Sequence, residues 1–248
     1  MHQNKLKVNE SKTEFLVVGS KSNRMKADVT QLRVGQSTVD TSETVRNLGI
    51  QIDETLSLEQ QIKDVVKSCR FHMHALWQIR PYLTQYNAKL LVHAAIISRL
   101  DYCNSLYVNM PLKQINKLQK VMNEAARLVT YTPRSEHITP VLKSLHWLPI
   151  KQRIEFKVLT VVYNSLQGNS PDYIRSLLTR YEPTRTLRSS DQNCLTEPRF
   201  RLKSAGYRSF SVAAPRLWNK LPLEIRNSKS ITAFKKVLKT HLFSQVYR

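Results

Sequence analysis

The chain has 248 residues, of which 41% are hydrophobic and 23% are charged, so a wholly disordered or fibrous protein is excluded. Its 39 Lys and Arg against 18 Asp and Glu give a net charge of +21, and such a surface is expected to meet an anionic partner, with nucleic acid the first to test. Glycine is scarce, with 5 residues, which disfavours a sandwich or barrel built on many tight turns.

Neither secretion nor membrane insertion is predicted. Met1–Lys12 is polar and lacks the apolar core of a signal peptide. The densest apolar run, Leu90–Ile97, contains a histidine and is far shorter than the roughly 20 residues that span a bilayer. The three cysteines lie far apart, so neither a disulfide framework nor a zinc knuckle is predicted. We expect a soluble protein of the cytoplasm or nucleus, not a secreted one, with no membrane partner and no small-molecule substrate.

The positive charge is confined to one part of the chain. Residues 1–65 contain 9 Lys and Arg and 9 Asp and Glu, so their net charge is zero, whereas residues 66–248 contain 30 and 9. The difference, 30 minus 9, is the entire excess of +21. Two modules with different partners are therefore expected.

The first 55 residues have the pattern of short strands. Glu14–Gly19 is rich in β-formers and ends at a glycine, and Leu32–Val39 alternates around a Gly-Gln pair as a small hairpin does. Val45–Ile52 is expected to be a further strand, broken by a glycine. Asp53–Thr55 is expected to turn the chain.

From Leu56 onward the apolar period changes from two to about 3.6, which predicts helices. The fold class is thus mainly α with a small N-terminal β segment (α+β). A long loop or extended arm is expected over Tyr181–Tyr207, where the period is lost. The first expected helix ends before Pro81, the second runs from about Asn87 to Tyr102, and the third begins at Pro111. Further helices are expected over 140–145, 151–166 and 171–179, and a last one after a cap at Ser230.

No pattern of catalytic or metal-binding residues is found in the sequence. Two-metal enzymes need clustered carboxylates, but the aspartates are isolated, and Asp53 with Glu54 is interpreted as a solvated turn. Cys69, His72 and Cys103 were weighed as zinc ligands, yet Cys69 lies on an apolar helix stripe, where core packing is preferred. Nucleophile motifs and glycine-rich phosphate loops are absent from the sequence. We expect no cofactor and no catalytic residue.

The third expected helix carries a basic stripe. Its four cations are spaced by 4, 3 and 7 residues, which places them within about 80° of one another, opposite the apolar face. A solvated face is the alternative interpretation. The stripe consists of Lys113, Lys117, Lys120 and Arg127.

A second basic group lies in the expected arm, and a third lies near the last helix. Arginine pairs with phosphate as a fork and aromatic rings stack on unpaired bases, so a group interleaved with Tyr181, Phe200 and Tyr207 predicts binding to single strands or RNA–DNA hybrid. An acidic protein partner is the alternative. The second group is Arg180, Arg185, Arg188, Arg199, Arg201, Lys203 and Arg208, and the third is Lys229, Lys235, Lys236 and Lys239.

The three tryptophans are interpreted as packing residues rather than stacking platforms. Trp77, Trp147 and Trp218 are each flanked by apolar residues. A large apolar ring in such a context is more often buried between helices than offered to a ligand.

Four strings stand out in the chain: residues 4–14, NKLKVNESKTE; residues 98–106, SRLDYCNSL; residues 145–150, LHWLPI; and residues 213–222, AAPRLWNKLP. In this order they resemble the reverse transcriptases of non-LTR retrotransposons, the LINE-type elements, in the Jockey and chicken-repeat-like lineages. The likeness covers nearly the whole chain.

The resemblance implies an arrangement of parts and an absence of catalysis. Residues 1–55 would be the last palm strands and the primer-grip hairpin, 56–132 a thumb-like helical bundle, and 133–248 a C-terminal helical region with a basic arm at about 180–208. The chain would begin after the family's metal-binding Asp-Asp turn, so Mg²⁺ belongs only to the intact enzyme. Lys12 would match the family's palm lysine. The implied partner is RNA or RNA–DNA hybrid, tracked by the thumb.

Three hypotheses about function remain open from the sequence. The first is a nucleic-acid-binding module without polymerase activity, which grips its partner with little sequence preference. The second is a fragment active in RNA-directed DNA synthesis only when a palm is supplied in trans, and the third is an inert transposon-derived relic. Low stability is expected for residues 1–55, because strands removed from a palm sheet leave an unpaired edge.

Overall fold

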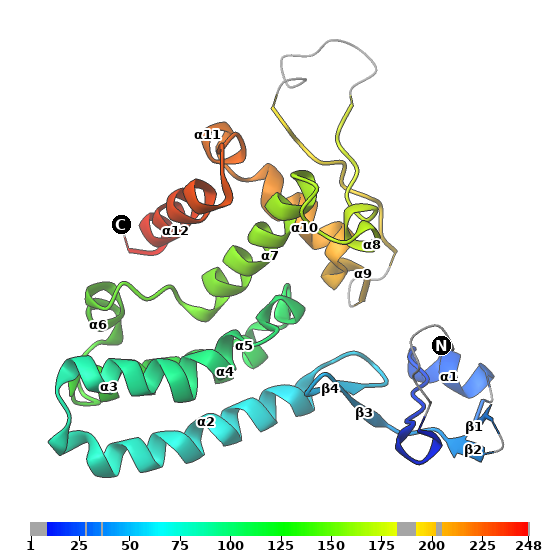
Figure 1. Ribbon diagram of the computed structural model, residues 1–248, viewed down its shortest axis with the longest axis horizontal. Coiled ribbons are helices and arrows are strands. Elements are labelled where there is room, and N and C mark those ends of the chain that lie inside the picture. The colour runs from blue at the N-terminus through cyan, green and yellow to red at the C-terminus, as the bar shows by residue number, and fades with distance from the viewer. Residues whose placement is uncertain (1–8, 28, 36, 183–191, 202–204, 248) are drawn as a thin grey trace. The chain divides into compact units, whose positions relative to one another are not determined.

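The computed structural model describes residues 9–27, 29–35, 37–182, 192–201 and 205–247 (Figure 1). The chain divides into an N-terminal unit, Met1–Asp64, and a helical unit, Val65–Arg248. Because residue 65 is uncharged, this division separates the charge as the sequence does: net zero in the N-terminal unit and +21 in the helical unit. The described chain is mostly helical with a small β segment near its start, which confirms the α+β class.

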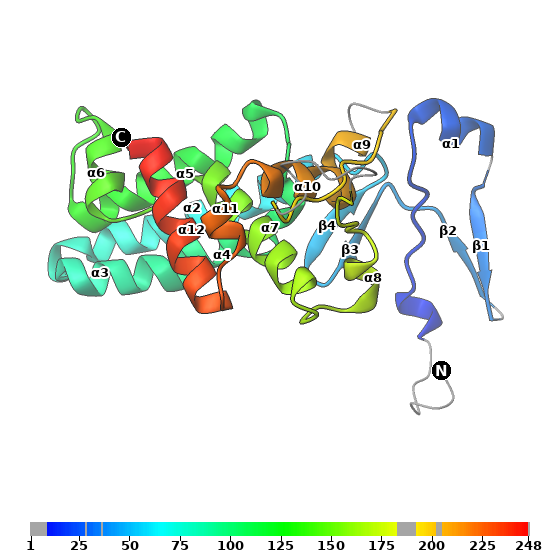
Figure 2. The same cartoon turned by 90° about the horizontal axis from the view of Figure 1, so that it is seen from above.

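The β segment of the N-terminal unit consists of two separate antiparallel hairpins (Figure 2). In the first, Leu32 pairs with Val39, as the alternating pattern predicts. In the second, Val45 pairs with Ile52, so the single strand expected over 45–52 is wrong. Leu48 and Gly49 both have positive φ, 47° and 82°, as a tight two-residue hairpin turn requires, and the glycine therefore turns the chain instead of breaking a strand. The strands are β1 (Gln31–Val34), β2 (Ser37–Asp40), β3 (Thr44–Asn47) and β4 (Ile50–Asp53).

The strand expected over Glu14–Gly19 does not form. Phe15 makes one isolated bridge to Thr41, and its carbonyl accepts a hydrogen bond from the amide of Ser42 at 2.7 Å. A short helix follows instead, α1 (Lys21–Ala27), whose first turn is capped where Ser20 Oγ accepts from the amide of Asn23 at 3.2 Å. A run of β-forming residues becomes part of a sheet only where another strand pairs along it, and this run has one isolated bridge.

A turn at Asp53 ties the second hairpin to the first long helix, α2 (Glu59–Ile79). The predicted turn forms, but its two carboxylates are half-buried and bonded within the protein, so the prediction that they are solvated is wrong. The carboxylate of Asp53 accepts from the amides of Ser57, at 2.9 Å, and Leu58, at 2.6 Å, and from the hydroxyl of Thr55 at 2.6 Å. Partial burial acts to raise the pKa of Asp53, but the hydrogen bonds from Thr55, Ser57 and Leu58 outweigh it, and the pKa lies below 3.8.

The helical unit is organised around α5 and α7. In Figure 1, α7 lies between α10 and α12, and it contacts both, while α5 contacts α3, α6 and α7. The ring of Tyr163 stacks on Phe234 with centroids 4.4 Å apart, and Trp218, 1% exposed, lies beside the same phenylalanine. The helices are α3 (Gln85–Val92), α4 (Ser98–Asp101), α5 (Leu112–Thr130), α6 (Ile138–Ser144), α7 (Ile150–Leu166), α8 (Asp172–Arg175), α9 (Ala205–Arg208), α10 (Phe210–Asn219), α11 (Leu223–Arg226) and α12 (Ile231–Tyr247).

Most expected helices are confirmed, with four differences: two shifted ends, one additional short helix and one interruption. The α6 helix begins at Ile138, before the expected 140, because His137 Nδ1 accepts from the amide of Thr139 as an N-cap. The α8 helix ends at Arg175, before the expected 179, and α9 falls inside the expected arm. The helix expected over 87–102 is interrupted by one π-helical turn, η4 (His93–Ile97). No helix among the described residues is long and apolar enough to cross a bilayer.

Candidate nucleic-acid interface

Lysine and arginine have different roles in this protein. Every ion pair between described residues has an arginine as its cation, as in Arg153 with Asp101 and Arg216 with Glu197. Arg80, 8% exposed, donates to the carbonyls of Leu128 at 2.6 Å and Val129 at 3.0 Å, where α5 ends without helical partners for them. No lysine side chain forms an ion pair or hydrogen bond with another described residue. The described lysines are therefore available to an external anion.

Three of those lysines form the basic stripe on α5. Lys113 and Lys120 are exposed and Lys117 is half-buried between them. The opposite faces of α5 are packed, with Leu118 and Met122 fully buried. At 1.5 Å per residue, the backbone positions of the three lysines span about 10 Å along the helix. The lysine stripe, Lys113, Lys117 and Lys120, is thus presented by a rigid core helix.

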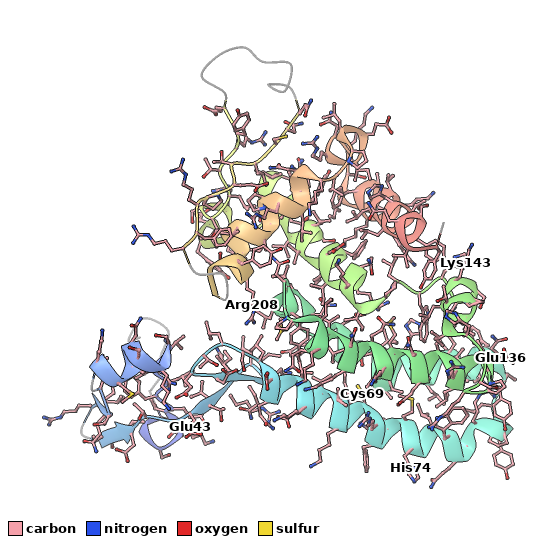
Figure 3. The ribbon with its side chains drawn as sticks, turned by 180° about the vertical axis from the view of Figure 1, so that it is seen from behind. Glu43, Cys69, His74, Glu136, Lys143 and Arg208 are labelled. Carbon is pink, nitrogen blue, oxygen red and sulfur yellow. The ribbon has the colours of Figure 1, made fainter. Side chains whose placement is uncertain are left out.

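The fourth predicted member of the stripe, Arg127, is engaged within the protein. Its Nη1 donates to the carbonyl of Pro133, and its Nη2 donates to the carbonyl of Glu136 at 2.7 Å. Glu136 lies in the loop that leads into α6 (Figure 3). These bonds fix the loop after α5, so the guanidinium contributes charge but has two of its donors already occupied.

A groove of about 540 Å³ lies between α2 and the end of α5. Arg70 and His74, one helical turn apart on α2, line it together with Trp77, Arg127 and Arg134, and Glu124 is its one carboxylate. Figure 3 shows His74 on the outer side of α2. The i, i+4 spacing of Arg70 and His74 places both on one face of α2, which is the part of this α2–α5 groove that the sequence could have shown.

Trp77 corrects one of the tryptophan predictions. Trp147 and Trp218 are 3% and 1% exposed, which confirms packing for these two, but Trp77 is 40% exposed. It follows Leu76, which faces the core, and successive residues point about 100° apart on a helix. Its ring lies 6.3 Å from that of Tyr131, whose face is taken by the guanidinium of Arg80 at 5.0 Å, so Trp77 is the aromatic ring that lines the α2–α5 groove.

The second predicted group is only partly described. Arg180 and Leu195 form an antiparallel bridge, which closes the base of the arm, while Arg199 and Arg201 are exposed. Asn219 holds this base through both the amide and the carbonyl of Leu195, each at 2.8 Å. Arg185, Arg188 and Lys203 lie outside the described residues.

The arm's aromatic rings bind a cation of the protein itself. The guanidinium carbon of Arg216 lies 4.9 Å from the centroid of Phe200 and 5.2 Å from that of Tyr207. Such cation–π contacts are typical of arginine over an aromatic face. Phe200 and Tyr207 are therefore partly occupied, and the exposed arginines beside them are the better candidates for phosphate contacts.

The described residues that could bind a metal ion or react as a thiol are not clustered. Among the residues that the structure describes, no three His, Cys, Asp or Glu side chains are close enough to hold a metal ion. Cys69 is fully buried, pointing from α2 toward the helices packed on it, as the core interpretation predicts (Figure 3). Burial raises the pKa of the Cys69 thiol to about 11, against the opposing charge of Arg99, so it stays protonated at neutral pH.

Comparisons with known protein families, with curated proteins and with solved structures find no match for this chain. The features that bear on function are the lysine stripe on α5, the α2–α5 groove and the exposed arginines of the arm.

Proposed function

We propose that this chain binds RNA or RNA–DNA hybrid through phosphate contacts, largely without sequence preference. The observation that carries the proposal is that the helical unit has an excess of +21 while its described lysines form no ion pair or hydrogen bond with another described residue. Lysine ammonium groups that neutralise phosphates release the counterions condensed on a nucleic acid, which is the main source of non-specific affinity.

The arrangement of the cations favours an extended polyanion over a compact acidic partner. The lysine stripe is linear, and beyond it the same face of α5 continues through Glu124 to Arg127 at the α2–α5 groove. Trp77 offers a partly exposed ring in that groove, and base stacking on such a ring stabilises unpaired strands. We therefore expect single-stranded RNA to bind more tightly than duplex DNA.

As to origin, we propose that the chain corresponds to the primer-grip, thumb and C-terminal region of a LINE-type reverse transcriptase and has no polymerase activity of its own. Supporting this are the four family-like strings and the order of a small β segment followed by helices. Primer extension with Mg²⁺ or Mn²⁺ is expected to yield no product from the purified chain. Product from this chain alone would overturn the proposal, and product only after addition of a palm fragment would favour the trans-acting alternative.

The binding proposal is tested by removing the lysine stripe. The variant Lys113→Gln/Lys117→Gln/Lys120→Gln is expected to lower the slope of log affinity against log salt by about 2 for single-stranded RNA, because each lost phosphate contact is worth about 0.7. A matched control changes three exposed lysines of the N-terminal unit, Lys21→Gln/Lys26→Gln/Lys63→Gln, with the same loss of charge. Equal effects from the two variants would show that net charge, not the stripe, governs binding.

A further inference from the structure

A second feature of the helical unit is a pocket of about 570 Å³, away from the lysine stripe. It is lined by α3, η4, α4, α7 and α12, and by the chain between α6 and α7. Its volume lies within the roughly 300–1,000 Å³ typical of small-ligand sites. Two of the four family-like strings, residues 98–106 and 145–150, meet here.

The pocket has an uncompensated positive charge. Lys89, Lys157 and Lys239 reach it from three different helices. Arg153 also lines it but is paired with Asp101, whose Oδ1 accepts from Nε at 2.8 Å. The arginine and the carboxylate neutralise each other, so three ammonium groups face a space with no second carboxylate in its lining. Such a set suits a phosphoryl group.

One side of the pocket is apolar. Leu145, Trp147, Leu148 and Phe156 line it, and the ring of His93 meets Trp147 edge to face at 5.5 Å and 82°. The Trp147 backbone is held in place, because its carbonyl accepts a hydrogen bond from the hydroxyl of Tyr247 at 2.8 Å. A rigid aromatic and aliphatic wall beside cations suits a ligand with both a flat ring and an anionic group.

A buried acceptor lacks a partner at the same place. Asn104, 3% exposed, lines the pocket, and its Nδ2 donates to Asp101 at 3.3 Å. No described residue donates to its Oδ1. A buried amide oxygen without a donor destabilises the fold, so a ligand that brings an amino or hydroxyl group would relieve it. The π-helical turn that begins at His93 is a second local irregularity, and such turns are frequent at functional sites.

We propose that this pocket binds a nucleoside phosphate, with the phosphate at the three lysines, the ring against the side chains of His93 and Phe156, and a ring or sugar donor at Asn104 Oδ1. The ligand is either a free nucleotide or the terminal nucleotide of a strand, which share this chemistry. The pocket does not include the lysine stripe, so the two sites are tested separately.

His93 at the rim gives the pocket a pH response. Partial burial, then the charges of Arg153 and Lys89, and more weakly Lys239, lower its pKa, while Asp101 opposes them. The imidazole is therefore neutral at pH 7 in the empty pocket. A bound phosphate would raise the pKa of His93, so binding should be linked to proton uptake by this imidazole.

The experiment is calorimetric titration of the full chain with AMP, adenosine and inorganic phosphate. We expect AMP to bind at least tenfold more tightly than either part, because the wall and the lysines act together. Lys157→Gln and Lys239→Gln, at exposed positions, should each weaken AMP binding several-fold, whereas Lys113→Gln/Lys117→Gln/Lys120→Gln should not. Asn104→Ala should weaken the binding of AMP without changing the binding of inorganic phosphate.

The results separate this proposal from the strand-binding one. No preference for AMP over its parts, or AMP binding unchanged in Lys157→Gln and Lys239→Gln, would overturn the pocket even if RNA still binds the stripe. Retained AMP binding with no RNA binding would uphold the pocket alone. An oligonucleotide with a 5′-phosphate, compared with the same strand ending in a 5′-hydroxyl, distinguishes a strand end from a free nucleotide: only a strand-end site prefers the phosphorylated strand over AMP.

Discussion

The N-terminal and helical units differ in what stabilises them. Of the described residues between 9 and 55, only Ile50 is buried, and the unit depends on local polar contacts such as the Asp53 turn and the Arg24–Glu54 ion pair. The helical unit buries an extensive apolar core, including Trp218 and Phe234, while its net charge is +21. The N-terminal unit has no net charge, so its weak core faces little self-repulsion.

This contrast shows where a protein can keep unpaired cations. Like charges repel and destabilise a compact state, so an excess of +21 needs a core that outweighs the repulsion. In the helical unit the arginines reinforce that core: Arg80 and Arg127 hold backbone carbonyls around the end of α5. The lysines are left on the surface. Each prediction below tests one side of this division.

The largest expected difference is in amide exchange. Amides of α5 and α7 should exchange orders of magnitude more slowly than those of β1 and β2, because isolated two-stranded hairpins are marginally stable. Hydrogen–deuterium exchange followed by mass spectrometry measures this directly. Protection of β1 and β2 equal to that of α5 would contradict the account of a weak N-terminal unit.

The next largest effect is expected from core truncation. Trp218→Ala should destabilise the helical unit by about 3–5 kcal/mol, because it empties a fully buried site and removes the hydrogen bond from Nε1 to the carbonyl of Asn193. Leu32→Ala, at a 44% exposed position of β1, should change stability by less than about 1 kcal/mol. Urea denaturation followed by helical circular dichroism measures both. A loss of less than about 1 kcal/mol in the free energy of unfolding for Trp218→Ala would contradict the role of Trp218 in the core.

A smaller effect separates arginine from lysine on α5. Arg127→Gln should destabilise the fold by about 1 kcal/mol through lost hydrogen bonds to the loop carbonyls. Lys120→Gln, on the same helix, should stay within about 0.5 kcal/mol but weaken RNA binding. Thermal unfolding and an RNA titration on each variant give the comparison. The reverse pattern, with Lys120 stabilising the fold, would break the division of roles.

The smallest effect concerns the Asp53 turn. Because its folded pKa is depressed, ionised Asp53 stabilises the turn above the ordinary carboxyl pKa of 3.8, and this contribution is lost as the pH falls through the lower folded value. Asp53→Asn should speed hydrogen exchange of the Ser57 and Leu58 amides at neutral pH. It should also remove the change in their protection that titration of the carboxylate causes at acid pH. Unchanged exchange at these two amides would show that the carboxylate does not hold the turn.

Much of the fold could be predicted because helix periodicity is a local property. Neighbouring residues alone decide three of its features: the apolar period of α2 from Ile62 to Leu76, the start of α5 after Pro111 and the cap at Ser230. The errors arose where a distant partner decides: Glu14–Gly19 has strand composition but no strand beside it. In Val45–Ile52, Leu48 adopts a positive φ that its residue type rarely takes.

The candidate site was less predictable, because charge in a sequence does not reveal a partner. Arg127 and Lys120 belong to one stripe by spacing, yet only the structure shows that Arg127 donates to carbonyls nine or fewer residues away. The pocket at Asn104 joins segments more than a hundred residues apart along the chain, such as Lys89 and Lys239, so no motif spacing could announce it.

The central claim is that the unpaired lysines of the helical unit bind nucleic acid through phosphates. Its most direct test is a titration of the full chain against single-stranded RNA, RNA–DNA hybrid and duplex DNA at two salt concentrations. The account predicts affinity that falls steeply with salt and is highest for single-stranded RNA. Weak binding to all three by a chain shown to be folded would contradict it and leave an acidic protein partner or an inert relic.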